Sequence, residues 1–183
     1  MIARSRGFAS VIVRPCDVDS ALRFLSAGVV KVASVVGYPH GANSSAVKQY
    51  EARDLLRRGV RDIYAYPNPG KLFSRQFQHQ EVELIQIADA CIEADASLKV
   101  VLDNALLDEE MKIITCRMAK RVSAHFVATT EPRDLELIRK YCADRVQLEC
   151  GGVRTMEEVR LAFAAGCARI ATPLELVRPA ATG

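Results

Sequence analysis

Short apolar segments alternate with longer segments of mixed polarity along the chain. Seven apolar segments are short and rich in β-branched residues, which predicts strands at residues 9–13, 30–36, 62–66, 98–103, 125–129, 146–150 and 169–171. Between them, apolar residues recur at helical spacing, which predicts helices at residues 17–27, 44–58, 76–94, 108–122, 131–142, 155–165 and 173–177. The sequence Pro-Asn-Pro-Gly at 67–70 predicts a turn.

Several residues of the kinds that begin and end helices support these boundaries. Asp17 and Asp108 are candidate N-caps, and Ser44 or Ser45 begins the second helix. Thr155 is followed three residues later by a glutamate, the pattern of a capping box. Gly59 is placed to end the second helix.

Strands that are apolar nearly throughout and are separated by helices are typical of a parallel sheet covered by helices. Seven strand–helix units in one chain favour a barrel of the TIM (β/α)8 type over an open sheet. A length of 183 residues is enough for one domain with a sizeable core, and no linker-like stretch divides the chain. We therefore expect a single domain over residues 1–183, with a frayed tail at about 179–183.

Composition narrows the classes of function. Half of the residues are hydrophobic and the net charge is only +3, which argues against a nucleic-acid partner. The six cysteines share no C-x-x-C spacing and predict buried free thiols in a reducing compartment, such as the cytoplasm or an organelle matrix. With three histidines and none at ligand spacing, no metal is expected, and no cofactor is implied.

No apolar run approaches the ~20 residues of a membrane span. The short basic start, residues 1–6, could be the remnant of a transit peptide, with the mitochondrion as one possible destination.

Several segments resemble the deoxyribose-phosphate aldolase family, whose members are class I aldolases with a barrel fold. The resemblance runs from about Gly7 to Leu174 and is most specific in the combination of G-Y-P-H-G and G-G-V-R-T. The segments that carry it are GFASV at 7–11 with RPC at 14–16, KVASVVGYPHG at 31–41, Lys48 with Glu51-Ala52, LKVVLD at 98–103, GGVRT at 151–155, and AG at 165–166 with ARI at 168–170.

The family's catalytic side chains are replaced at their aligned positions. The resemblance implies a Schiff-base lysine in a strand reading F-[IV]-K-T-S, where this chain has Ala128. A second family lysine aligns with Leu148, or with Gln147 after a one-residue shift, and the family's catalytic aspartate aligns with Tyr64. Covalent and acid–base catalysis need such groups. We therefore expect a degenerate, non-catalytic relative, or pseudoenzyme, serving as a structural or scaffolding subunit of a larger assembly.

Tyr64 and Tyr66 lie on one face of their predicted strand and are expected to fill space that substrate would occupy. Glu149 is unusual inside an apolar strand, and a contact with another chain is one interpretation of it.

Lys99 is the surviving candidate for catalysis. It shares a strand face with Val101 and Asp103, and the family keeps a lysine here near the active centre. Two interpretations are open: Lys99 forms an imine with an aldehyde, or it is an inherited lysine paired with a carboxylate. The first would make the chain a residual deoxyribose-phosphate aldolase, a lyase of deoxyribonucleotide catabolism.

A weak remnant of the family's phosphate site remains at Gly151, Gly152 and Arg154. It suggests the further alternative of a protein that binds a small phosphorylated sugar. Two other residues count against it: Pro173 removes a backbone donor, and Glu131 adds a negative charge where phosphate would approach.

The family's first strand, reading I-D-H-T-L, has no counterpart before Gly7. A barrel of seven strands would leave two unpaired edges. Either a partner chain, a second copy or a rearranged terminus covers the gap, or the sequence is a truncated gene product.

Overall fold

A computed structural model describes residues 2–25, 28–102, 106–142 and 144–177 of the chain. Asp103, Ala27 and the tail predicted at 179–183 lie outside the described residues. The described part contains seven strands, all parallel and paired in sequence order. The strands are β1 (Ser10–Val13), β2 (Lys31–Val36), β3 (Asp62–Ala65), β4 (Ser97–Leu102), β5 (Phe126–Thr129), β6 (Gln147–Cys150) and β7 (Arg169–Ile170). The seven predicted strands are therefore confirmed to within a residue or two at each end.

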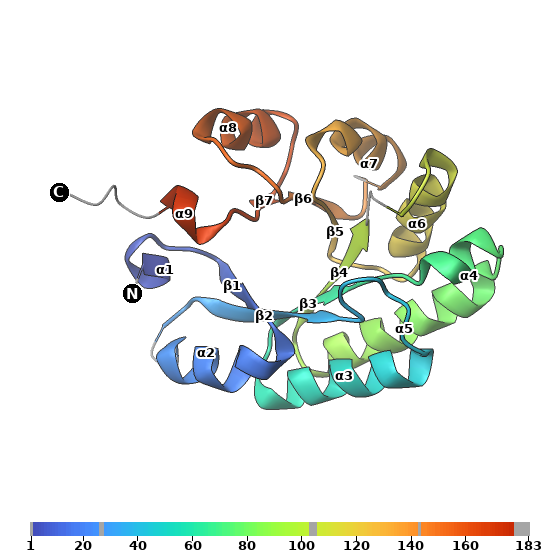
Figure 1. The fold of residues 1–183 in the computed structure, drawn as a ribbon, viewed down its shortest axis with the longest axis horizontal. Helices are drawn as coiled ribbons and strands as arrows, with labels where there is room; N and C mark the ends of the chain where they lie inside the picture. The colour runs from blue at the N-terminus through green and yellow to red at the C-terminus, as the bar shows by residue number, and fades with distance from the viewer. Residues whose placement is uncertain (1, 26–27, 103–105, 143, 178–183) are drawn as a thin grey trace.

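The sheet curls into a half-barrel with helices on its outer side (Figure 1). The helices are α1 (Ile2–Ser5), α2 (Val18–Leu25), α3 (Ser45–Arg58), α4 (Pro69–Phe73), α5 (Phe77–Glu93), α6 (Glu109–Arg121), α7 (Leu135–Cys142), α8 (Met156–Ala164) and α9 (Leu174–Val177), with 3-10 turns at Pro15–Asp17 and Pro132–Asp134. In the described residues β1 pairs only with β2 and β7 only with β6, so the barrel is open between β1 and β7. The expected barrel architecture, lacking one strand, is confirmed.

Three of the predicted helix ends have the expected capping geometry. The Asp108 side chain accepts a hydrogen bond from Met111 N–H, and Thr155 forms a complete capping box with Glu158. Gly59 ends α3 in the left-handed region, with φ of 111°.

Two local predictions were wrong. Residues 67–70 were predicted as a turn, but helix α4 begins there. The Asn68 side chain accepts a hydrogen bond from Lys71 N–H, and Pro69 occupies the first turn of the helix. Asp17 does not cap α2: it ends a 3-10 turn, and its carboxylate accepts from Arg14 at 2.9 Å.

Strand alternation divides the apolar side chains into two layers. The large core lies between the sheet and the helices and includes Leu98, Val100 and Leu148. A smaller cluster fills the inside of the barrel, where Tyr64 packs with Ala33, Val101 and Ala128, and Val35 and Tyr66 lie against it. Tyr64 and Tyr66 therefore lie inside the barrel, as their spacing predicted.

All six cysteines are free, and five are buried as expected; Cys16, which follows β1, is exposed. No helix in the described ranges is long and apolar enough to cross a membrane.

Candidate active site

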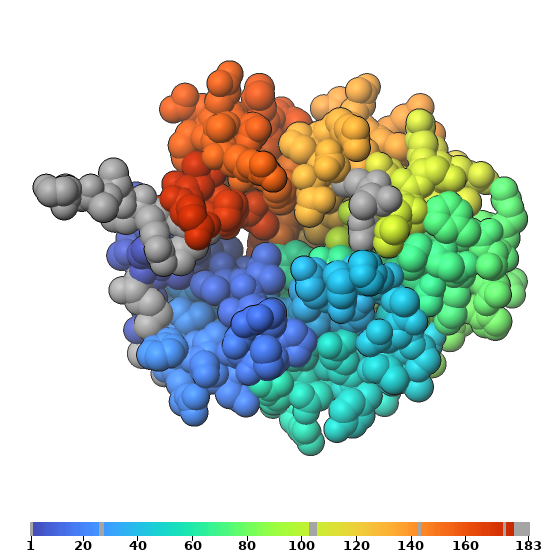
Figure 2. Space-filling view, in the orientation of Figure 1, coloured from blue at the N-terminus to red at the C-terminus, as the bar shows by residue number. Residues whose placement is uncertain are grey.

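A cavity of about 620 Å³ lies along the opening between β1 and β7. Its walls include residues of β1, β7 and the segment after β7, and its polar lining includes Lys99, Tyr64, Glu149 and Arg169. Figure 2 shows the blue N-terminal and red C-terminal segments facing each other across a notch on this side. The volume is within the usual range for small-molecule sites, about 300–1,000 Å³.

Lys99 projects from β4 into the barrel, and its side chain has no exposed surface. Its Nζ lies 2.6 Å from Glu149 Oε2, 2.9 Å from Tyr64 Oη and 3.3 Å from Asp62 Oδ2. Lys99 is therefore paired with two carboxylates, Glu149 and Asp62, as one of its two interpretations predicted. Pairing does not exclude the other interpretation, because Lys99 also borders the cavity.

Glu149 connects the amine to a phenol. One carboxylate oxygen accepts from Lys99, and the other accepts a very short hydrogen bond from Tyr64 Oη. Burial, followed by the negative charge of Glu149, raises the pKa of Tyr64, so this phenol stays protonated. Glu149 is only 2% exposed and faces the barrel interior, so its interpretation as a contact with another chain was wrong.

Asp62 and Arg169 complete the buried charges. Arg169 Nη1 lies 2.5 Å from Asp62 Oδ2, the same oxygen that faces Lys99. The guanidinium carbon of Arg169 and the Lys99 amine lie 4.9 and 4.8 Å from the centre of the Phe126 ring. Two cations therefore face two carboxylates, which is the balance that a low-dielectric interior requires.

The structure explains why the aligned family positions do not describe this site. Ala128 lies inside the barrel and pairs in register with Glu149, so the position given to the family lysine is next to a carboxylate here. Leu148 points to the outer core, because side chains alternate along a strand. Among the residues that sequence reasoning gave no catalytic role, Glu149, Asp62 and Arg169 complete the cluster. The signal for them was a charged residue at an inward-facing strand position.

In the predicted phosphate site, two of the backbone N–H groups are already hydrogen-bonded within the chain. Gly151 N–H donates to Thr129 O at 2.7 Å, and Arg154 N–H donates to a carboxylate oxygen of Glu158 at 2.6 Å. The Arg154 side chain is exposed, and Gly152 has a φ of 71°. The structure therefore does not bring Gly151, Gly152 and Arg154 together as a set of free donors.

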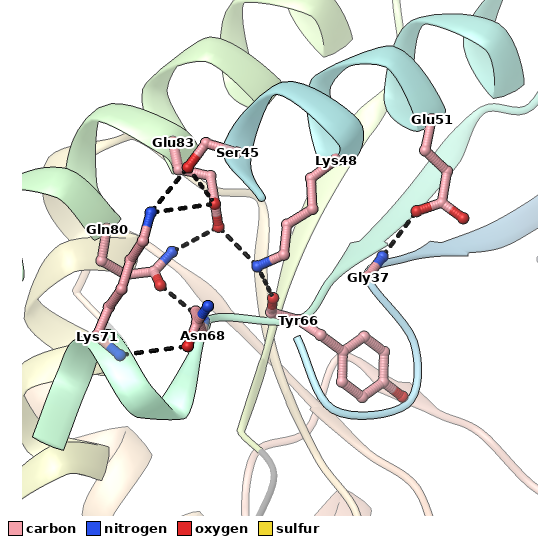
Figure 3. Close-up of polar contacts among 9 residues, drawn as sticks. All are labelled: Gly37, Ser45, Lys48, Glu51, Tyr66, Asn68, Lys71, Gln80 and Glu83. Atoms are coloured by element: carbon pink, nitrogen blue, oxygen red, sulfur yellow. Dashed lines mark hydrogen bonds and ion pairs between the residues drawn. The ribbon is translucent and has the colours of Figure 1, made fainter. Parts of the chain in front are cut away.

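A second fully buried lysine, Lys48, lies on the other side of the sheet, between α3 and α5 (Figure 3). Its Nζ donates to Tyr66 O and to Glu83 Oε1, each at 2.7 Å. Gln80 and Ser45 also donate to Glu83, so the carboxylate is saturated. This network ties the segment after β3 to two helices, and Lys48 does not border the cavity.

A curled parallel sheet with ionisable side chains gathered inside it places the chain in the class of α/β-barrel proteins of the aldolase type. No protein-family model matches it. The deoxyribose-phosphate aldolase of Clostridium kluyveri (strain ATCC 8527) is 35% identical over 173 residues, 90% of this chain and 79% of that protein. The deoxyribose-phosphate aldolase of Clostridium perfringens (strain 13) is 32% identical over 172 residues, 89% of this chain and 76% of that protein. The solved structure of QR15, an aldolase, superimposes with a TM-score of 0.86 at 26% identity, covering 93% of this chain and 80% of that one. The chain therefore belongs to the deoxyribose-phosphate aldolase family.

These relatives overturn one expectation. Curated proteins at 32–35% identity over about nine-tenths of the chain are aldolases, so the expectation of a non-catalytic scaffolding subunit was wrong. The physical reason is that the expectation weighed only the aligned positions. Folding brings Lys99 together with Glu149 and Tyr64 from three separate strands, and no comparison of single positions reveals that set.

Proposed function

We propose that this chain is a Schiff-base aldolase that cleaves a deoxyribose-phosphate substrate, with Lys99 as the amine that forms the imine. The observation that carries the proposal is the position of Lys99 Nζ at the cavity wall, within hydrogen-bond distance of both Glu149 and Tyr64. Imine chemistry needs an amine with an acid–base partner close to it, and these three side chains meet that need.

The amine must be neutral before it attacks an aldehyde. Glu149 is the group that can remove the proton, because its Oε2 lies 2.6 Å from Nζ. Transfer of this proton turns the ion pair into a neutral amine beside a neutral acid, so the step leaves no unpaired charge in the buried cluster. Asp62 and Arg169 stay paired with each other and position the cluster.

The reaction then balances without a cofactor. Lys99 adds to the aldehyde carbon of open-chain deoxyribose 5-phosphate, and Glu149 relays the two protons that the nitrogen loses to the carbinolamine oxygen, which leaves as water. The resulting iminium draws electrons from the C2–C3 bond while Glu149 takes the C3 hydroxyl proton, releasing glyceraldehyde 3-phosphate. Glu149 then protonates C2 of the enamine, and water hydrolyses the imine to acetaldehyde and the free lysine.

Borohydride trapping tests the proposal. The protein is incubated with deoxyribose 5-phosphate or acetaldehyde, reduced with borohydride and digested, and the modified peptide is found by mass spectrometry. We expect one adduct, on Lys99, that is lost in Lys99→Met and kept in Lys48→Met, the matched buried lysine outside the cavity. Absence of an adduct, or an adduct that persists in Lys99→Met, rejects the proposal.

We also propose that a second copy of the chain or another protein chain lies over the open edges of β1 and β7. The support is that each strand pairs on one side only among the described residues, and unpaired edges favour pairing. Native mass measurement of the purified protein tests this, and a monomer whose edge amides are protected from hydrogen exchange refutes it.

A further inference from the structure

We infer that Lys48, held by Glu83, is a positioning residue for the candidate active site: it fixes the carboxyl end of β3 and thereby the Tyr64 phenol. The inference rests on the proposed function for the reaction that it affects, but the anchoring of β3 can be measured without any turnover. Lys48 does not border the cavity, so this role needs no contact with substrate. The role is also compatible with another chain over the edges of β1 and β7.

The Lys48 ammonium takes the place of a strand donor at the end of β3. Tyr66 N–H donates to Val36 O at 3.0 Å, which continues the ladder between β2 and β3 by one residue. In a parallel ladder the N–H and C=O of one residue point to the same neighbouring strand, so Tyr66 O also points toward β2. β2 ends at Val36, and Gly37 turns away with a φ of 74°. Lys48 Nζ donates to Tyr66 O at 2.7 Å and satisfies this carbonyl (Figure 3).

Glu83 holds the Lys48 amine in this position. Its Oε1 accepts from Lys48 Nζ at 2.7 Å and from Gln80 Nε2 at 2.8 Å, and the side chains of the ion pair are each only 1% exposed. Burial lowers the pKa of Lys48, and Glu83 opposes this shift through its hydrogen bond and its charge. The Gln80 side-chain oxygen accepts from Asn68 N–H at 2.7 Å. One carboxylate therefore anchors two backbone groups of the segment after β3, a carbonyl and an N–H.

The loop after β2 packs onto the segment that Lys48 anchors. The Tyr38 and Tyr66 rings meet edge to face, with their centroids 5.5 Å apart. The backbones also approach closely, because a Cβ added at Gly41 would lie 2.0 Å from Pro67 O. Closely packed groups transmit a displacement rather than absorb it. A shift of the β3 end would therefore move both loops together.

The anchored carbonyl lies two residues after Tyr64 on the same chain segment. β3 has only four residues, and Tyr66 packs against the inner cluster to which Tyr64 belongs. Tyr64 Oη donates to Glu149 and accepts from Lys99 at 2.9 Å, so the proton transfers at Glu149 depend on where this phenol lies. Misplacement of a reacting group by about 1 Å can cost about a hundredfold in rate. Release of the β3 end would displace the phenol and leave Lys99, which belongs to β4, in the cavity wall.

Hydrogen exchange measured by mass spectrometry tests the anchoring of β3 directly. The test variant combines Lys48→Met with Glu83→Gln, which removes the donor to Tyr66 O and takes away one cation and one anion together. We expect residues 62–69 to exchange at least about tenfold faster than in wild type, the scale of one hydrogen bond to a charged group. The strands β5 and β6 should keep their protection. Unchanged exchange at residues 62–69 overturns the inference.

Two further variants make the exchange result specific. Glu81→Gln with Arg121→Gln is the matched control, because it removes an outer ion pair that begins on the same helix, α5, and it should leave the exchange of β3 unchanged. If the double variant of the network does not fold, Lys48→Gln replaces it. The shorter glutamine side chain cannot reach both Glu83 and Tyr66 O, so the same acceleration is expected, and its absence refutes the anchoring.

Turnover compared with stability distinguishes positioning from stabilisation alone. In Lys48→Met the buried Glu83 carboxylate loses its partner, so stability in urea and kcat for deoxyribose 5-phosphate should both fall. Adding Glu83→Gln should restore stability, yet kcat should stay at least about tenfold below wild type, with little change in KM because the network lies outside the cavity. Recovery of kcat together with stability rejects the positioning role. Failure to trap an imine on the wild-type protein refutes only the proposed function, because hydrogen exchange still decides whether Lys48 anchors β3.

Discussion

Replacing Lys99 by methionine tests whether the buried cluster is a balanced set of charges. The side chains of Lys99, Asp62 and Glu149 are at most 3% exposed, so solvent screens their interactions little. Without the lysine, Glu149 loses its ion pair and Asp62 keeps the one with Arg169. Removal of one partner of a buried ion pair costs about 3–5 kcal/mol, and we expect Lys99→Met to lower the free energy of unfolding by that amount.

Glu149→Gln removes the excess charge that Lys99→Met creates, so the double variant should recover part of the loss. We expect a coupling free energy of about 2–3 kcal/mol between the two substitutions, the upper part of the range for residues in one network. Urea unfolding followed by circular dichroism at pH 7 measures all four proteins. Lys120→Met is the control, because Lys120 forms an exposed pair with Asp144 and should cost less than about 1 kcal/mol. Additive losses, or a Lys99→Met protein within about 1 kcal/mol of wild type, would refute the charge-balance argument.

Two further predictions concern the loop after β6. The amide of Arg154 lowers the pKa of Glu158, so the stability that this carboxylate contributes is present above the ordinary glutamate pKa and is lost as pH falls through the lowered one. Urea unfolding should therefore show Glu158→Gln less stable than wild type at pH 7 and equal to it in strong acid; a constant difference would contradict this. Gly152 has a φ of 71°, and an added Cβ would lie 2.3 Å from Thr130 O, so we expect Gly152→Ala to cost at least about 2 kcal/mol. Thermal unfolding compares the loss of stability in Gly152→Ala with that in the control Gly166→Ala. Gly166 has a φ of 92°, but no atom lies within 4 Å of its added Cβ. Equal losses in the two variants would exclude the clash as a cause.

Much of the fold could be predicted because its signals are local. The periods of the apolar residues identified all seven strands, and caps such as Asp108 and Thr155 marked helix starts. The failures were also local: Asn68 and Pro69 begin a short helix where the composition indicated only a turn. Short helices depend on one capping bond and a few tertiary contacts, and a pattern of apolar residues does not report these.

The candidate site could be predicted only in part. The sequence by itself determined a parallel α/β barrel of the aldolase family and an inward-facing Lys99, because strand alternation fixes the face of each side chain. Only the tertiary structure decided which groups Lys99 meets: Asp62 comes from β3, Glu149 from β6 and Arg169 from β7. Curling the sheet brings these strands around one interior, and the resulting contacts span up to 107 residues of sequence. Charge compensation in a low-dielectric interior depends on distances in space, so it is settled only when the sheet curls around the cluster.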